Sequence, residues 1–293
     1  MIDYNSEAQA YDTTRGGEPR AEAAADALEQ LLPQGPATVL DIACGTGIVT
    51  RRLRRPGRTV LGVDRSPGML VPAARRIPGG AVCGDATRLP FASGSVDAVV
   101  MVWLLHLLPE STAGAVLAEA LRVLQPGGRL VTTVDKEAAY FTEESGVARA
   151  TAELRRRYAP HAPDRSERIR AWAADHGLRP VGEARFPGTG QGRGARQWRE
   201  SIDAGRIPWC NRADAEQVAE AVRRLAALPD QETPIADPLY RLLALEVWGA
   251  PAPPPAGPPP PPGPLGRAIG AGPQGPGEYP ATPPKSTPPR RRG

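Results

Sequence analysis

Residues 38–53, TVLDIACGTGIVTRRL, decide the fold of this chain. The stretch opens with a short apolar run that contains one acid, Asp41, and continues into a turn of small residues with Gly45 and Gly47. The apolar run is typical of a buried strand, and the amphipathic residues 47–55 predict a helix. Because glycine lets the backbone turn tightly and leaves no Cβ in the way of a ligand, the turn is a candidate binding site.

The same alternation of strand and helix continues along the chain. A Gly-rich loop is expected over residues 187–197, and a turn over residues 125–128, QPGG. Apolar runs predict strands at residues 37–43, 58–64, 80–86, 129–135, 178–186 and 238–248, and a further strand with its exit at residues 96–107. Helical patterns occupy residues 20–32, 66–76, 112–124, 143–158, 166–177 and 214–228. Strands of this kind, alternating with helices, indicate an α/β fold with a doubly wound, mostly parallel sheet covered on both faces.

Composition divides the chain into a body and a tail. Residues 249–293 hold 17 of the 35 prolines and almost no large apolar side chains, so burial could not offset the entropy cost of ordering them. We expect residues 1–248 to form one domain and residues 249–293 to be a disordered Pro/Gly-rich tail. Five basic residues and one acid lie in the tail, which leaves 31 basic and 31 acidic residues in the body. The net charge of +4 therefore does not indicate nucleic-acid binding by the body.

Cysteine usage and hydropathy restrict the cellular setting. Cys44, Cys83 and Cys210 are far apart and lack the paired spacing of zinc sites or disulfide frameworks. No apolar run reaches the roughly 20 residues that a membrane-spanning helix needs. The first residues, MIDYNSEAQAYD, do not resemble a signal peptide. We therefore expect a cytoplasmic protein that binds neither membrane nor nucleic acid.

A second acid points to the kind of ligand. Asp64 ends the strand predicted at residues 58–64, and a carboxylate at the carboxyl edge of a parallel sheet can accept both hydroxyls of a ribose. A dinucleotide site needs another glycine three residues after Gly47, where this chain has Thr50, and Asp41 would oppose a pyrophosphate. An adenosine-containing cation such as a sulfonium fits better than a nicotinamide dinucleotide.

Four motifs in order carry a resemblance to a known family. They are VLDIACGTG at residues 39–47, VLGVDRSPGML at 60–70, CGDATRLPFASGSVDAVV at 83–100 and LRVLQPGGRLVTTV at 121–134. Together they resemble the class I S-adenosylmethionine-dependent methyltransferases, and most of all the small-molecule group of the ubiquinone/menaquinone-biosynthesis type. The resemblance implies a Rossmann-like sheet of seven strands and S-adenosyl-L-methionine as the cofactor.

The resemblance also implies roles for matching residues. The turn would hold the methionine end of the cofactor, Asp64 the ribose hydroxyls and Asp85 the adenine amino group. Ala43 stands where many members have glycine, and Val102 stands where a polar residue is common, so a side-chain contact to the cofactor is not expected from Val102. The cofactor-binding residues so implied are Asp41, Ala43, Cys44, Gly45, Gly47, Asp64, Met69, Asp85 and Ala86.

His106 is the candidate catalytic residue, because it follows the fourth strand at the ligand edge and a neutral histidine can accept a proton from a hydroxyl nucleophile. The alternative is a histidine that only shapes the pocket. No metal is expected, because Val102 to Leu105 offer no oxygen ligands where metal-dependent relatives carry acids. The residues predicted to line the acceptor pocket are Tyr11, Arg15, Trp103, Leu104, Leu107 and Trp209.

The sequence thus predicts an enzyme that transfers a methyl group from S-adenosylmethionine to a small-molecule acceptor by in-line displacement. Two alternatives are a nicotinamide oxidoreductase on a similar sheet and a non-catalytic cofactor-binding module that acts through a partner. The acceptor and the oligomeric state are not specified by the residues.

Overall fold

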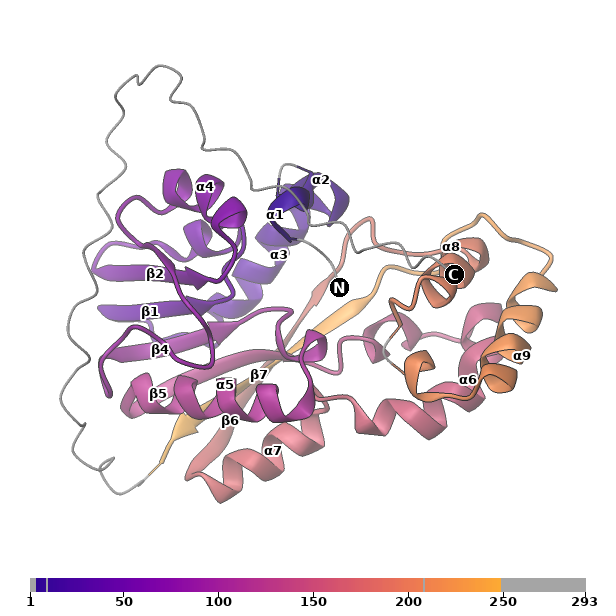
Figure 1. Cartoon of the computed structure of the whole chain (residues 1–293). Coiled ribbons are helices and arrows are strands. Elements are labelled where there is room, and N and C mark those ends of the chain that lie inside the picture. The colour runs from indigo at the N-terminus through magenta and orange to yellow at the C-terminus, as the bar shows by residue number, and fades with distance from the viewer. Residues whose placement is uncertain (1–3, 9, 208, 249–293) are drawn as a thin grey trace, which may run out of the picture. The chain divides into compact units, whose positions relative to one another are not determined.

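A seven-stranded sheet forms the centre of the computed structural model, which describes residues 4–8, 10–207 and 209–248 (Figure 1). The strand order is β3-β2-β1-β4-β5-β7-β6; β7 runs antiparallel to both of its neighbours, β5 and β6, and the other neighbouring pairs are parallel. The predicted fold class, a doubly wound and mostly parallel α/β sheet, is confirmed for these residues. The expected tail, residues 249–293, lies outside the described part of the chain.

The strands agree closely with the apolar runs of the sequence. Their bounds are β1 Ala37–Ile42, β2 Arg58–Asp64, β3 Ala81–Cys83, β4 Val96–Met101, β5 Leu124–Val134, β6 Leu178–Pro187 and β7 Leu239–Val247. The α-helices are α1 Tyr4–Glu7, α2 Tyr11–Thr14, α3 Gly17–Glu29, α4 Pro67–Arg76, α5 Glu110–Val123, α6 Gly146–Tyr158, α7 Ser166–Asp175, α8 Ala195–Asp203 and α9 Ala215–Ala226. The 3₁₀ turns of the described residues are η1 Thr50–Leu53, η2 Leu105–Leu107, η3 Ala138–Phe141, η4 Ala159–His161 and η5 Cys210–Arg212.

Both faces of the sheet are buried, as the apolar strands require. In β4, Val99 and Met101 pack toward α5 and α7, whereas Ala98 and Val100 pack toward α3 on the opposite face. Successive side chains of a strand point to opposite faces, so a strand buried on both sides must be apolar at every position. This explains why the strands read as continuous apolar runs.

The helix expected over residues 47–55 is wrong: only the 3₁₀ turn η1 forms there. Ile48, Val49 and Thr50 are β-branched and lose side-chain freedom in a helix, and Pro56 ends any helix before β2 begins. The Thr50 hydroxyl instead donates to the Asp41 carboxylate at 2.6 Å. The first crossover is therefore tight, and α3, from the N-terminal side, covers much of this face of the sheet.

Three further elements differ from expectation. The QPGG residues lie within β5 rather than in a separate turn. Helix α8 begins inside the predicted Gly-rich loop, where Ala195, Trp198 and Ile202 form a buried helical stripe that the neighbouring glycines obscured. The short helices α1 and α2 precede the first predicted helix.

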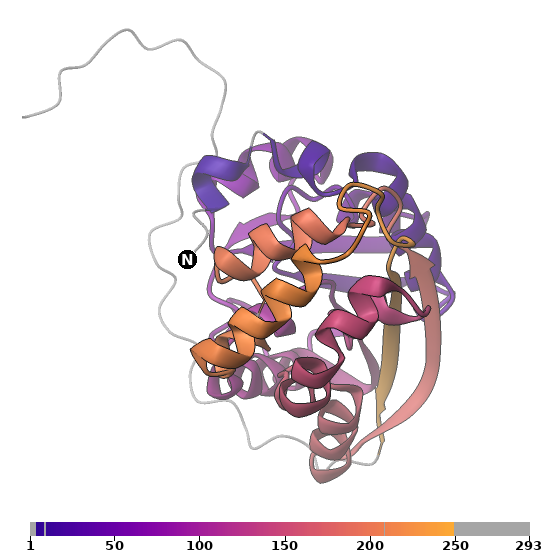
Figure 2. The same cartoon turned by 90° about the vertical axis from the view of Figure 1, so that its right-hand side faces the viewer.

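Helices α6, α8 and α9 form a separate group beyond the carboxyl ends of the parallel strands (Figure 1), and Figure 2 shows this group in front of the sheet. Their own apolar cluster includes Tyr140, Trp198, Trp209 and Leu225, all buried. The functional site therefore lies between the strand ends and this helical group. Within the described residues, we find no helix with the length and apolar character needed to cross a membrane.

Candidate functional site

A cavity of about 1000 Å³ opens at the carboxyl edge of the sheet. One part of its wall comes from residues that follow β1 to β4, and the other from residues 135–138, 158–165 and 204–212. Open α/β sheets bind ligands at this edge, and the volume is at the upper end of the range usual for small-molecule sites. We refer to these two parts as the strand-end wall and the helical wall.

Asp64 organises the strand-end wall. Its Oδ2 accepts the Gly45 N–H at 2.9 Å and its Oδ1 accepts the Ser66 N–H at 2.9 Å, so the carboxylate joins the glycine turn to the start of α4. An ionised carboxylate has about four acceptor sites, which leaves capacity for ligand hydroxyls. Asp64 lines the cavity.

Gly45 and Gly47 have different roles in the turn, one toward a ligand and the other toward α4. Both have positive φ, 55° at Gly45 and 72° at Gly47. A Cβ on Gly47 would approach the Ala73 Cα to 3.2 Å, so this glycine permits the turn to pack against α4. A Cβ on Gly45 would meet nothing within 4 Å, and Gly45 borders the cavity. Only Gly45 leaves room for a ligand against the turn.

Asp85 stands at the next strand end, after β3. Its Oδ1 accepts the backbone N–H and the hydroxyl of Thr87, both at 2.8 Å, and these hydrogen bonds lower the pKa of the Asp85 carboxyl. Asp85 is exposed and lines the cavity beside Ala86. Buried Met69 lines the same end.

Several predicted site residues do not line the cavity: Asp41, Cys44, Gly47 and Arg15. Asp41 lies within β1 and is buried behind the turn, where burial raises the pKa of its carboxyl to about 7. Burial also raises the pKa of the Cys44 thiol, which makes it a poor nucleophile. Arg15 lies 3.5 Å from Glu7 in an ion pair.

The N-terminal segment covers the strand-end wall and contributes Tyr4 and Tyr11 to the cavity. Asn5 Oδ1 accepts the Gly68 N–H at 2.9 Å and the Ser66 hydroxyl at 2.8 Å, at the beginning of α4. Asp12 accepts the Thr46 hydroxyl at 2.6 Å and pairs with Arg76 at 2.7 Å. Asn5 and Asp12 thereby attach the N-terminal helices α1 and α2 to α4 and to the turn that borders the cavity.

Backbone strain is concentrated at the site. Among the described residues, the non-glycine residues with positive φ are Ala43 at 61°, Trp103 at 58° and Asp135 at 51°. They follow β1, β4 and β5, and all three line the cavity. Such conformations cost about 1–2 kcal/mol each for L-residues and cluster at functional sites. The strain supports a functional role for this edge without defining the chemistry.

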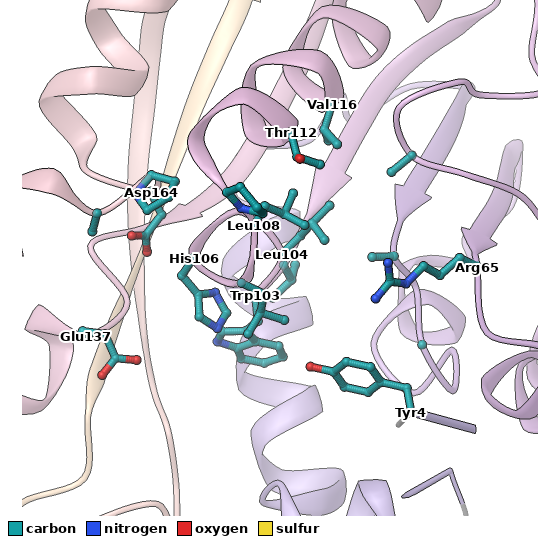
Figure 3. Close-up of a pocket in the computed structure, with 18 of the residues that line it drawn as sticks. Tyr4, Arg65, Trp103, Leu104, His106, Leu108, Thr112, Val116, Glu137 and Asp164 are labelled. Carbon is teal, nitrogen blue, oxygen red and sulfur yellow. The ribbon is translucent and has the colours of Figure 1, made fainter. Parts of the chain in front are cut away.

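Trp103 forms the floor between the two walls. Its backbone N–H donates to the Thr133 hydroxyl at 2.8 Å, and its ring meets Phe186 and Tyr240 edge to face at 5.7 Å. The buried Arg20 guanidinium lies 3.4 Å from the ring centroid. These contacts hold the indole in one orientation, next to Leu104 and His106 in Figure 3.

His106 is buried and lines the cavity, and its Nδ1 has no hydrogen-bond partner among the described residues. Burial lowers the pKa of the imidazole well below its usual value, and Lys136, Arg20 and Arg15 lower it further. The ring is therefore neutral near pH 7 and is a weak base. Leu104 and exposed Leu107, both predicted pocket residues, also line the cavity.

The helical wall carries several charges. Asp135 pairs with Arg165 at 3.3 Å and with Arg241 at 3.0 Å. Glu137 Oε1 lies 2.9 Å from Lys136 Nζ. Buried Asp164 accepts the Lys136 backbone N–H at 2.8 Å, and burial raises the pKa of its carboxyl to about 6. The same wall includes the predicted pocket residue Trp209, which is buried.

The predicted site residues include only Trp209 from the helical wall, and they leave out Arg65 of the strand-end wall. The charged residues that the prediction missed are Arg65, Asp135, Glu137, Asp164, Arg165, Arg206 and Arg212. Asp135 and Arg65 directly follow strands, so the strand-end rule could have found them. No comparable rule places residues 204–212 at the sheet edge. Among the described residues, no three His, Cys, Asp or Glu side chains form a possible metal-binding group.

Known proteins are similar to the segment that builds the strand-end wall. Residues 40–132 match the family model described as a methyltransferase domain. A demethylmenaquinone methyltransferase from Beutenbergia cavernae is 50% identical over 94 residues, which are 32% of this chain and 38% of that protein. Another, from Mycobacterium sp. strain KMS, is 38% identical over 149 residues, 48% of this chain and 63% of its own length. This chain thus spans less than two thirds of the length of these relatives.

A solved structure extends the likeness to the fold. A protein from Bacillus halodurans, described as a methyltransferase, superposes with a TM-score of 0.50 at 19% identity, over 78% of this chain and 99% of its own. At this identity the likeness concerns the fold alone. Residues 40–132 thus match a methyltransferase domain, and over that segment the predicted resemblance to the class I S-adenosylmethionine-dependent methyltransferases of the ubiquinone/menaquinone-biosynthesis type is confirmed.

Proposed function

We propose that this protein transfers a methyl group from S-adenosyl-L-methionine to a small-molecule acceptor. One observation carries the proposal: the segment that matches the methyltransferase domain, residues 40–132, contains Gly45, Asp64 and Asp85, and these three line one end of a single cavity. The relatives are named for demethylmenaquinone, so an acceptor of that class is the first to test.

The strand-end wall fits the cofactor. Asp64 has acceptor capacity for ribose hydroxyls, and Asp85 stands one strand further along, where the adenine amino group would lie. Met69 and Ala86 offer apolar surface between them for the adenine ring. The open space over Gly45 admits the methionine end. When bound, S-adenosylmethionine supplies a methyl group that its sulfonium has already activated.

The remaining residues then have to orient the acceptor and exclude water, which is the main contribution a protein makes to such a displacement. Trp103, Leu104 and Leu107 offer an apolar floor, and Tyr11 closes the cavity from the N-terminal side. In this proposal His106 is a neutral pocket residue and not a general base, because its lowered pKa makes it a weak proton acceptor.

The proposal also covers metal dependence and cellular location. The residues that follow β4 are apolar, which supports a metal-independent reaction. Cys44, Cys83 and Cys210 are free thiols, which supports a cytoplasmic, reducing location.

Calorimetric titration of the full chain with S-adenosylhomocysteine and with NAD tests the cofactor. We expect binding of the first and none of the second. Tight NAD binding without S-adenosylhomocysteine binding would instead favour an oxidoreductase. Transfer of labelled methyl from S-adenosylmethionine to a short-chain demethylmenaquinone, followed by a wider acceptor screen, tests the reaction. Cofactor binding without transfer to any acceptor would favour the non-catalytic module.

A further inference from the structure

Three residues between α8 and α9 that line the cavity carry hydrogen-bond donors. They are Arg206, Trp209 and Arg212. Both arginines are exposed, and neither has a carboxylate within 4.0 Å in the part of the chain that the structure describes, whereas Arg165 of the same wall is paired with Asp135. Arg206 reaches only the Glu200 carbonyl, at a long 3.4 Å.

Trp209 adds an independent observation. Its side chain is 3% exposed, and its indole N–H is buried without a hydrogen-bond partner among the described residues. A buried donor without a partner costs about 1–3 kcal/mol, so native proteins usually satisfy it with a bound group or water. An indole N–H can only donate, which means that the missing partner is an acceptor.

The acids of the helical wall do not supply that acceptor. Asp135 lies between two arginines, and Glu137 lies against Lys136. Glu137 Oε2 is itself buried and without a partner among the described residues, but the charge of Glu137 is balanced by Lys136. Asp164 accepts a backbone N–H from residue 136. Among the described residues of this wall, the carboxylates and arginines without an ion-pair partner within 4.0 Å are thus Asp164 and the exposed Arg206 and Arg212, and the two arginines are the cations available to an anion.

We propose that the acceptor, unlike a neutral quinone such as demethylmenaquinone, carries a carboxylate or phosphate group, which Arg206, Arg212 and the indole N–H of Trp209 bind. The inference rests on the proposed function, because it assigns the helical wall to the acceptor. Guanidinium groups match both anions in geometry, and their hydrogen bonds to an ionised group are stronger than those between neutral groups. The anion would hold the far end of the acceptor and direct its other end toward Trp103 and the strand-end wall.

The test uses aromatic probes that differ only in charge: naphthoate, naphthamide and naphthyl phosphate. Each is titrated into the full chain, with and without saturating S-adenosylhomocysteine. We expect naphthoate, naphthyl phosphate or both to bind about tenfold tighter than neutral naphthamide, a difference that added salt reduces. The tighter of the two anions identifies the group. Equal affinities for all three, or no binding of either anion in the roughly millimolar range, would overturn the proposal.

Substitutions test which side chains bind the anionic group of the probe. The double variant Arg206→Gln/Arg212→Gln should lose the preference for the charged probes and keep its affinity for naphthamide. Trp209→Phe, which keeps the ring and removes the donor, should weaken anion binding about threefold. Arg223→Gln is the matched control, since Arg223 is an exposed arginine of α9 that pairs with Glu220 and does not line the cavity. A preference that survives in the double variant would place the anion elsewhere and refute the assignment.

The outcomes separate this inference from the proposed function. If S-adenosylhomocysteine binds and no charge preference appears, the anion site alone is wrong. If S-adenosylhomocysteine does not bind, the methyltransferase proposal fails, and a charge preference that the double variant abolishes would still establish an anion site on the helical wall.

Discussion

The two walls of the cavity are built by different means. The strand-end wall comes from single residues at the ends of successive strands, fixed by backbone hydrogen bonds to Asp64 and Asp85. The helical wall comes from segments that follow β5 and depends on ion pairs such as those of Asp135. The matched domain, residues 40–132, contains most of the first wall and none of the second. Likeness to known proteins therefore informs the cofactor side, and the acceptor has to be inferred from this chain's own residues.

The largest expected effect concerns Asp41, which lies behind the strand-end wall. Its folded pKa is about 7, above the ordinary 3.8, so between these values the folded state binds an extra proton and the free energy of unfolding falls as pH rises. Asp41→Asn keeps an acceptor for Thr50 and removes the titration. Relative to wild type, it should gain about 4 kcal/mol between about pH 4 and about pH 8, measured by urea unfolding.

Exposed Asp26→Asn is the control for Asp41 and should follow the wild-type curve. Asp164, whose carboxyl pKa is also raised by burial, contributes equally to all three proteins and cancels in the comparison. Parallel curves for wild type and Asp41→Asn would show that Asp41 is ionised in the folded state.

Asp64→Ala tests the cofactor side directly. The change removes a carboxylate that accepts two backbone N–H groups and, by our proposal, the ribose hydroxyls. We expect the affinity for S-adenosylhomocysteine to fall by roughly 1.5–3 kcal/mol, the range for hydrogen bonds to charged groups. Asp26→Ala should bind as wild type does. Unchanged affinity in a folded Asp64→Ala protein would remove Asp64 from the cofactor site.

His106 lies where the two walls meet, and its protonation distinguishes a base from a pocket residue. Because its pKa is lowered by burial, we expect the proton NMR signal that His106→Asn removes to show no titration between about pH 6 and about pH 8. In a methyl-transfer assay, His106→Asn should raise KM and lower kcat less than about tenfold. A signal that titrates near neutrality, with a rate loss beyond about a hundredfold, would make His106 the general base.

Ala43→Gly gives the smallest effect and tests whether strand-end strain can be relieved. Glycine adopts the φ of 61° without strain. The strain energy relieved exceeds the extra conformational entropy that glycine loses on folding. The free energy of unfolding should rise by about 0.5 kcal/mol. Ala171→Gly, at an exposed position in α7, should instead lower it by about 1 kcal/mol. A loss of stability at both positions would mean that the turn stores no strain at Ala43.

The difference between the walls also explains what the sequence could predict. Parallel strands end at one edge, so acids such as Asp64 and Asp85 could be brought together from their positions in the motifs. Asp41, predicted to bind the cofactor, lies within β1 and accepts the Thr50 hydroxyl, so a contact between its side chain and the cofactor stays a prediction. Residues 204–212 reach the cavity through the packing of α8 and α9, a long-range arrangement that local periodicity does not encode. Of these residues, only Trp209 was among the predicted pocket residues.

The contacts that Asn5 and Asp12 make with α4 and the glycine turn have a kinetic consequence. Asn5 and Asp12 bind the start of α4 and the glycine turn, while Tyr4 and Tyr11 cover the cavity between them. A ligand that entered and left along this side would have to separate these polar contacts each time. Exchange of spent cofactor for fresh cofactor would then be slower than diffusion, and its rate would depend on the strength of two side-chain attachments that touch no reacting atom.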